Sequence, residues 1–258
     1  GSGPIPMADV VLYEEGSGVG ADTFGRTIAI GDLDGDGYDD LTVGNPNPSE
    51  VFVYYGDSTW ASSQTSNDAN LTFSGNTVSA AGRSLDIGPC KHPTFGATTC
   101  LAVGAPTDNS NDGTVYVLYD IASKTSGSLV SSADVEINGS SGDYFGETVA
   151  LTPDVTTTAP AASEASLVVG EKLSGTAYVF GNGDIFTSST SSGARASITN
   201  SLGTGWFVGG SGAVSRDTTE HQLLLGDQGA ESSTGSTYYG ALYVIDAPVF
   251  GPYDAATD

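Results

Sequence analysis

The 258-residue sequence is poor in basic residues, with only seven lysines and arginines against 31 aspartates and glutamates. The formal net charge of −24 repels nucleic-acid phosphates and anionic lipid surfaces, so we expect no nucleic-acid partner. Composition leaves two interpretations of this acidic protein open. The carboxylates bind divalent cations, or they hydrate the surface of a halophilic protein in high salt.

The sequence also lacks any apolar stretch of the ~18 residues that a membrane helix needs, so we expect no direct membrane insertion. Histidines number only two, His92 and His221, and they lie in separate segments without a nucleophile to pair with. The runs "GSGVGA" (16–21) and "GDST" (56–59) imitate cofactor and hydrolase motifs, but each falls in a predicted turn without the structural context of that motif. We therefore expect a protein that is not an enzyme.

Cysteine is equally scarce, and the two cysteines, Cys90 and Cys100, lie in one short predicted loop. This spacing favours a local disulfide over half of a metal site, although two free buried thiols are the alternative. A disulfide indicates an oxidising compartment. We therefore expect an extracellular protein, secreted or at the cell surface.

Repetition is what the sequence has in abundance. Four apolar runs, "EVFVYYG", "TVYVLYD", "TAYVFGN" and "ALYVIDA", place Phe52, Tyr116, Tyr178 and Tyr243 at equivalent positions 64, 62 and 65 residues apart. Each run follows another that ends in glycine, and each of those follows a small-residue turn. A more polar fourth segment closes the first three units. Four short strands per unit of about 60 residues are typical of a β-propeller.

The sequence therefore predicts an all-β fold, a β-propeller of four four-stranded blades. The fourth unit lacks its last strand, and residues 9–15 resemble one, so we expect this N-terminal strand to pair into the last blade and close the ring. A fragment of a larger propeller is the alternative. The predicted organisation is a tag or linker (1–8), one propeller domain (9–247) with blades at about 24–74, 82–138, 146–199 and 209–246 plus strand 9–15, and a C-terminal tail (248–258).

Several short motifs resemble a known family. "FG" at 24–25 and 145–146, "GNP" at 44–46, "GAP" at 104–106 and the loop "DLDGDGYDD" are similar to the FG-GAP repeats of integrin α-subunit β-propellers. The resemblance extends over about residues 9–246, although the third and fourth repeats are degenerate and family propellers normally have seven blades. It implies a binding or cell-adhesion module.

The acidic loop has the spacing of a calcium site. Asp32, Asp34, Asp36, the backbone carbonyl of Tyr38, and Asp40 occupy alternate positions, and Gly37 permits the sharp turn. Unmetallated, these carboxylates repel one another, whereas a bound Ca²⁺ makes the same cluster favourable. Position 12 is Val43 in an apolar strand, so the loop is not an EF-hand. A solvated turn without an ion, or a site for Mg²⁺ or Mn²⁺, is the alternative.

The loops at the opposite face are predicted to carry ligand, as the corresponding face does in the family. They contain Asp22, Asp108, Asn109, Asp143, Tyr144, Trp206, Tyr238 and Tyr239, a mixture of acids and aromatics suited to a polar partner or a sugar. Ordinary loop composition explains the mixture nearly as well. We expect a calcium-stabilised extracellular module that binds a protein or carbohydrate at the cell surface. The alternatives are an accessory domain of a glycan- or lipid-acting enzyme and a structural tile of a surface assembly.

Overall fold

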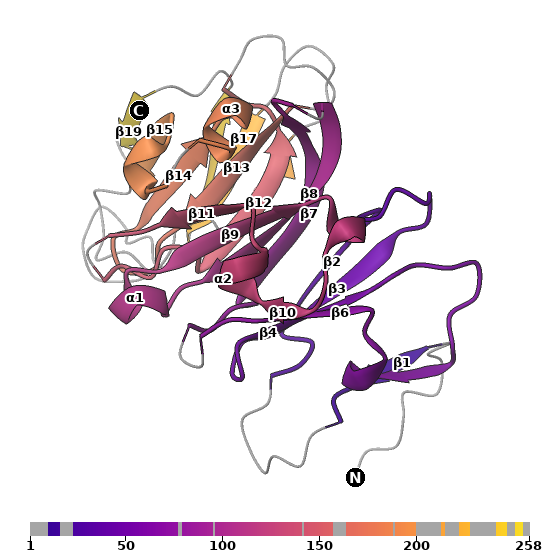
Figure 1. The fold of residues 1–258 in the computed structure, drawn as a ribbon. Helices are drawn as coiled ribbons and strands as arrows, with labels where there is room; N and C mark the ends of the chain where they lie inside the picture. The colour runs from indigo at the N-terminus through magenta and orange to yellow at the C-terminus, as the bar shows by residue number, and fades with distance from the viewer. Residues whose placement is uncertain are drawn as a thin grey trace.

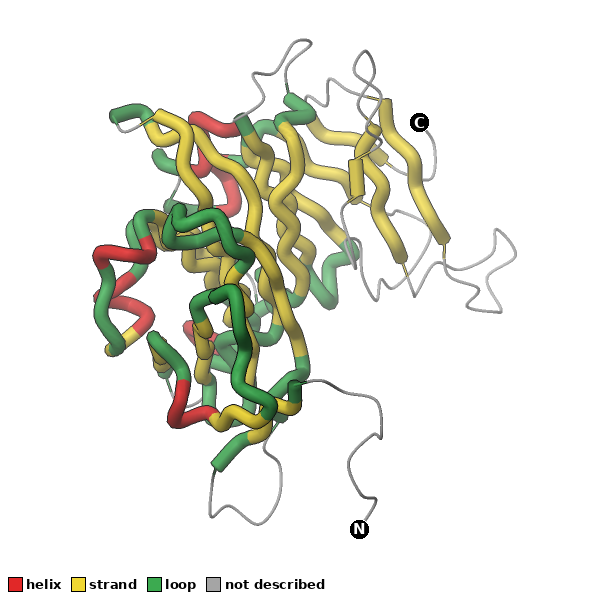
Figure 2. The backbone as a smooth tube through the Cα atoms, turned by 90° about the vertical axis from the view of Figure 1, so that its right-hand side faces the viewer, coloured by secondary structure: helices red, strands yellow, loops and turns green. Residues whose placement is uncertain are grey.

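A computed structural model describes residues 10–15, 23–76, 79–94, 96–140, 142–156, 164–187, 189–199, 213–214, 222–227, 241–246 and 251–254. The described chain is mostly β, which confirms the predicted fold class at this level. Figure 1 shows the sheets following one another in chain order, from the indigo strands to the orange and yellow ones. Figure 2 shows the short helices at the periphery of these sheets.

The first and second sheets each contain four antiparallel strands, and the strands lie side by side in the order in which they follow along the chain. The first consists of β2 (Thr27–Gly31), β3 (Asp40–Asn45), β4 (Glu50–Tyr54) and β6 (Leu71–Ser74), extended by the parallel β10 (Gly127–Ser128). The second consists of β7 (Ser84–His92), β8 (Gly96–Ala105), β9 (Thr114–Tyr119) and β11 (Val135–Asn138).

The third and fourth sheets repeat the arrangement. The third consists of β12 (Thr148–Pro153), β13 (Ala165–Gly170), β14 (Thr176–Phe180) and β15 (Ala196–Thr199), extended by β19 (Gly251–Asp254). The fourth is described for β16 (Ala213–Val214), β17 (Gln222–Asp227) and β18 (Ala241–Asp246). A separate two-stranded sheet joins β1 (Val11–Tyr13) to β5 (Ser63–Thr65).

In the part of the chain that the structure describes, the helices lie in connections and are only one turn long. They are α1 (Asp108–Asn111), α2 (Leu129–Ser132), α3 (Asn182–Ile185), η1 (Ser66–Asp68), η2 (Ile121–Ser123) and η3 (Ser191–Gly193).

The sheets pack face to face through three hydrophobic clusters, one between each pair of successive sheets. Val53 and Phe73 of the first sheet share a cluster with Leu101 of the second. Val117 of the second sheet shares one with Leu167 of the third, and the third and fourth sheets share the last. The first strands of the sheets also touch in order, β2 against β7, β7 against β12 and β12 against β16. Each described sheet thus buries at least one face against a neighbouring sheet, as repeat architectures do.

The repeated glycines are required at these junctions. A Cβ on Gly44 would collide with the carbonyl of Gly82 in the next repeat, and one on Gly104 would collide with that of Gly146. A hydroxyl donates to the same two carbonyls, Thr27 Oγ1 to Gly82 at 2.6 Å and Ser84 Oγ to Gly146 at 2.9 Å. The short segments that recur in the sequence therefore make the contacts that join one sheet to the next.

The N-terminal strand does not close the array, and that prediction is wrong. β1 pairs in parallel with β5, within the first repeat, instead of with the last sheet. The reason lies in its side chains: Leu12 packs against the buried Val43, Phe52 and Tyr54 of the first sheet, and Asn45 Nδ2 donates to Glu14 Oε1 at 3.0 Å. These contacts hold the strand beside β3 and β4.

The C-terminal tail also differs from the prediction. Within residues 248–258, β19 adds a parallel strand to β15, the outer strand of the third sheet. An outer strand exposes a row of unpaired backbone groups, so any nearby extended segment can extend the sheet there. β10 extends the first sheet at β6 in the same way.

Candidate metal centre and ligand face

The acidic loop connects β2 to β3, which pair through Gly31 and Asp40 at its base. Two of its glycines, Gly35 (φ +82°) and Gly37 (φ +92°), adopt the left-handed backbone conformation that other residues rarely take. The side chain of Leu33 points into the core and is 5 % exposed. The apolar anchor and the two glycines fold the eight-residue connection back on itself, so that its carboxylates gather on one side.

Backbone amides fix the direction of these carboxylates. Asp32 accepts hydrogen bonds from Gly35 N at 2.7 Å and Gly37 N at 3.1 Å. Asp34 Oδ1 accepts one from Asp36 N at 3.0 Å, and Asp36 Oδ1 accepts one from Tyr38 N at 2.8 Å. Such bonds shape a tight acidic turn before any ion is considered.

Asp40 is the buried member of the group, with no exposed surface. Its two oxygens accept hydrogen bonds from Leu33 N and Gly56 N, both at 2.7 Å. Burial raises the pKa of this carboxyl above its ordinary value, while the two amides oppose the shift. Asp40 therefore ties the acidic loop to the start of the segment that follows β4.

Three of the predicted ligands come together. Carboxylate oxygens of Asp32, Asp34 and Asp40 lie within 4.8 Å of one another. Two oxygens bound to one Ca²⁺ lie at most about 5 Å apart, twice the metal–oxygen distance, so this spacing fits. The donors are hard oxygens, which suit Ca²⁺ and exclude a preference for soft metals. The cluster can hold a divalent cation such as Ca²⁺.

The spacing does not support the other two predicted ligands, Asp36 and the carbonyl of Tyr38. The carboxylate of Asp36 lies outside the group of three. The carbonyl of Tyr38 belongs to a residue whose side chain is 47 % exposed. Their roles as ligands stay predictions.

The second repeat has a disulfide where the first has the acidic loop. Cys90 and Cys100 are bonded, with Cα atoms 5.9 Å apart, and both are fully buried. They do not lie in a loop as predicted, because β7 and β8 continue as a paired ladder from Ser84↔Gly104 to His92↔Gly96. The disulfide favours an oxidising compartment. No helix among the described residues is long and apolar enough to span a membrane.

The predicted ligand face is only partly where the sequence placed it. Asp22, Trp206, Tyr238 and Tyr239 lie outside the described residues. Asp108 is 5 % exposed and accepts hydrogen bonds from Tyr116 Oη at 2.7 Å and Asn76 Nδ2 at 3.1 Å, so it supports the fold instead of facing a ligand. Asn109 Nδ2 donates to Asn138 Oδ1 at 2.9 Å.

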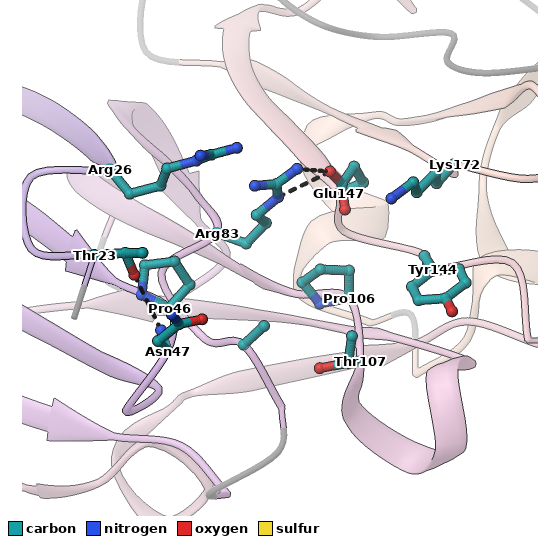
Figure 3. A pocket seen from close by; sticks show the side chains of 11 residues that line it. Thr23, Arg26, Pro46, Asn47, Arg83, Pro106, Thr107, Tyr144, Glu147 and Lys172 are labelled. Carbon is teal, nitrogen blue, oxygen red and sulfur yellow. Dashed lines mark hydrogen bonds and ion pairs between the residues drawn. The ribbon is translucent and has the colours of Figure 1, made fainter. Parts of the chain in front are cut away.

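Tyr144 and Asp143 take different positions on this face. Tyr144 lines a pocket of about 320 Å³, drawn in Figure 3, while the carbonyl of Asp143 accepts Lys172 N at 2.9 Å. The sequence reasoning missed the charged residues of the pocket, Arg26, Arg83, Glu147 and Lys172. The sequence did contain a signal for this pocket: Arg26, Arg83 and Glu147 each directly follow the repeated glycine of their unit.

Glu171 is a buried carboxylate beside this face, 2 % exposed. Its Oε2 accepts hydrogen bonds from Ser174 Oγ and, at 3.4 Å, from Tyr178 Oη, whereas Oε1 has no hydrogen-bond partner among the described residues. Burial, reinforced by the nearby Asp143, raises the pKa of Glu171 from 4.5 to about 7 against the lowering effect of those two hydroxyls. The folded protein thus keeps this proton to a higher pH than the unfolded chain does.

We expect Glu171→Gln to stabilise the protein at high pH only. Between pH 4.5 and about 7 the unfolded chain has lost the proton that the folded state retains, so the free energy of unfolding of the wild type falls as the pH rises through this window. Above it, the ionised carboxylate costs about 3 kcal/mol, since one pKa unit is worth 1.36 kcal/mol and the shift from 4.5 to about 7 is about 2.5 units. Thermal unfolding at pH 4, 6 and 8 should show the advantage of the variant growing with pH. A difference that stays constant across the series would contradict this.

Residues 24–59 match the model of the FG-GAP repeat. A search of curated proteins finds no relative of the chain. The matched segment includes the Phe24–Gly25 turn, strands β2 to β4 and the whole acidic loop, so the resemblance seen in the motifs is confirmed for the first repeat. Residues 24–59 are thus an FG-GAP repeat, and its β2–β3 connection carries the cluster of Asp32, Asp34 and Asp40.

Proposed function

We propose that the protein is a calcium-stabilised, extracellular binding or adhesion module of the integrin-like β-propeller type, without catalytic activity of its own. The observation that carries the proposal is the position of the acidic cluster within the FG-GAP repeat. An ion held by Asp32, Asp34 and Asp40 would fix the hairpin of the first sheet and take no part in a reaction. The disulfide in the equivalent hairpin supports the extracellular location.

We further propose that the four sheets form a ring, closed by packing between the first sheet and the fourth. At one end of the array Ile28 and Ile30 of β2 are 60 % and 61 % exposed, while Ala29 between them is buried against the second sheet. At the other end Leu242 and Val244 of β18 are 64 % and 54 % exposed, while Tyr243 and Ile245 pack toward the third sheet. These two pairs of apolar side chains are exposed at the two ends of the described array, and burying them together would remove both from water.

Substitution of Ile28 by Glu tests the ring. In a closed ring this side chain is buried, so the variant should lose about 1.5–3 kcal/mol of stability, the cost of exposing an isoleucine. Val130→Glu is the matched control, since Val130 is 47 % exposed on α2 and belongs to neither exposed pair. Equal melting temperatures of the two variants would contradict closure. If the stability lost by Ile28→Glu depends on protein concentration, this face of β2 forms a contact between two copies of the protein instead.

The binding role is tested by a panel of glycans and extracellular proteins presented to the immobilised protein, with calcium and with chelator. We expect at least one ligand to bind, and to bind more weakly after chelation because the first sheet loosens. Turnover in a parallel screen of glycan and ester substrates would overturn the non-catalytic assignment. Calcium-dependent self-assembly in light scattering, without any panel ligand, would make the protein a structural tile.

A further inference from the structure

The pocket in Figure 3 gathers positive charge in a protein that has little of it. Arg26, Arg83 and Lys172 line it, which is three of the seven lysines and arginines in the sequence. Glu147 is the one acidic residue in the lining, which leaves a net formal charge of +2. Since the whole chain carries −24, this concentration is opposite in sign to the rest of the molecule.

The same turn places these side chains in each of the first three repeats. The carbonyls of Thr23, Ala80 and Tyr144 accept the amides of Arg26, Arg83 and Glu147, at 2.8, 3.1 and 3.2 Å. Ala80 and Tyr144 hold left-handed backbones, at φ +52° and +62°, which is uncommon for residues other than glycine. A strained conformation repeated in two neighbouring turns persists only where the surroundings fix it, and such residues cluster at binding sites.

The charged groups of the pocket are oriented toward one another. Arg83 Nε donates to Glu147 Oε1 at 2.8 Å, and Arg83 Nη2 contacts the same oxygen, so Glu147 holds this guanidinium over the pocket. Figure 3 shows Arg26 pointing toward Arg83 from one side, and Lys172 pointing toward Glu147 from the other. Arg26 is exposed. Lys172 Nζ also lies over the ring of Tyr144, 5.6 Å from its centroid. The lining carries more positive than negative formal charge, which favours an added anion.

We propose that this pocket binds the carboxylate of an acidic saccharide, a sugar with one uronic-acid residue. The inference rests on the proposed binding function and names its ligand class. Guanidinium groups match the planar carboxylate, with which they can form two parallel hydrogen bonds. Pro46 and Pro106 supply apolar surface for the C–H face of a sugar ring. The volume of about 320 Å³ lies at the lower end of the range for small-ligand pockets.

Charge argues against the other sources of a carboxylate or sulfate. An acidic peptide or a polyanion carries further negative groups that would lie across the acidic surface outside the pocket and be repelled. A saccharide with one carboxylate places its only charge inside the pocket and neutral hydroxyls outside it. The pocket therefore selects a single acid on a neutral scaffold.

Isothermal titration of the full chain in calcium tests this with a disaccharide that ends in glucuronic acid. The neutral disaccharide with glucose in that position is the matched probe, and a short peptide with one glutamate is the competing one. We expect the uronate to bind, the neutral sugar to bind at least tenfold more weakly, and added NaCl to weaken the uronate. Arg26→Gln and Lys172→Gln should each reduce its affinity about tenfold, and Arg26→Gln, at an exposed position, should leave the melting temperature unchanged.

Arg195→Gln is the control variant, because it removes the same charge from an ion pair with Asp184 that lies outside this pocket. It should bind the uronate as the wild type does. Equal affinity for both sugars, tighter binding of the peptide, or binding that neither pocket variant changes would overturn the proposal. If the uronate fails while another panel ligand binds, only this inference falls. If nothing in the panel binds, the proposed function falls with it.

Discussion

We expect chelation of calcium to lower the melting temperature of the wild-type protein by about 5–10 °C and to leave that of Asp34→Asn unchanged. The reason is that an ion bound only by the folded state adds RT ln(1 + [Ca²⁺]/Kd) to its stability, about 2.7 kcal/mol at one hundred times Kd. In a chain of this size each kcal/mol shifts the melting temperature by about 2–4 °C. Scanning calorimetry with millimolar Ca²⁺ and with chelator measures the effect.

The loop supplies its own control for this experiment. Asp39 is exposed and lies outside the group formed by Asp32, Asp34 and Asp40. Asp39→Asn removes the same charge from the same turn, so it should keep the full response to chelation. If the wild type melts at one temperature with and without chelator, the acidic cluster is a solvated turn and not a metal centre. If Mg²⁺ restores stability as well as Ca²⁺ does, the site is not specific for calcium.

The third strands of the first three repeats, β4, β9 and β14, could be predicted from the sequence because their apolar runs are buried on both faces. Phe52 and Tyr116 are 4 % and 1 % exposed, as expected of positions that recur between packed sheets. The acidic loop could be predicted because alternate residues of a tight turn converge on one side. In both cases the information is local, since spacing along the chain decides the geometry.

Contacts that depend on the packing of one segment against another could not be predicted in this way. The pairing of β1 depends on a single inward side chain, Leu12, because Val11 and Tyr13 are 38 % and 46 % exposed. A strand without an apolar face does not specify its partner. The pocket likewise forms where turns from three repeats meet. Asp108 has a structural role because the hydroxyl of the buried Tyr116 donates a hydrogen bond to it, and spacing along the chain does not reveal that contact.

The second large effect concerns the disulfide. We expect Cys90→Ala/Cys100→Ala to lose about 3 kcal/mol of stability, the chain-entropy value for a closed loop of this length. The sequence separation is 10, and both sulfurs are buried in the cluster between the second and third sheets, so lost packing adds to the loss of the cross-link. Melting should occur about 6–12 °C lower, at 2–4 °C per kcal/mol.

Reduction of the wild type separates the cross-link from the packing. Reductant keeps both sulfur atoms in the core and removes only the bond, so it should lower the melting temperature by less than the double substitution does. The double variant should not respond to reductant at all. Equal melting temperatures of oxidised and reduced wild type would mean that the β7–β8 ladder, which pairs from Ser84↔Gly104 to His92↔Gly96, holds this hairpin without the bond. The second sheet would then need no covalent counterpart to the acidic loop of the first.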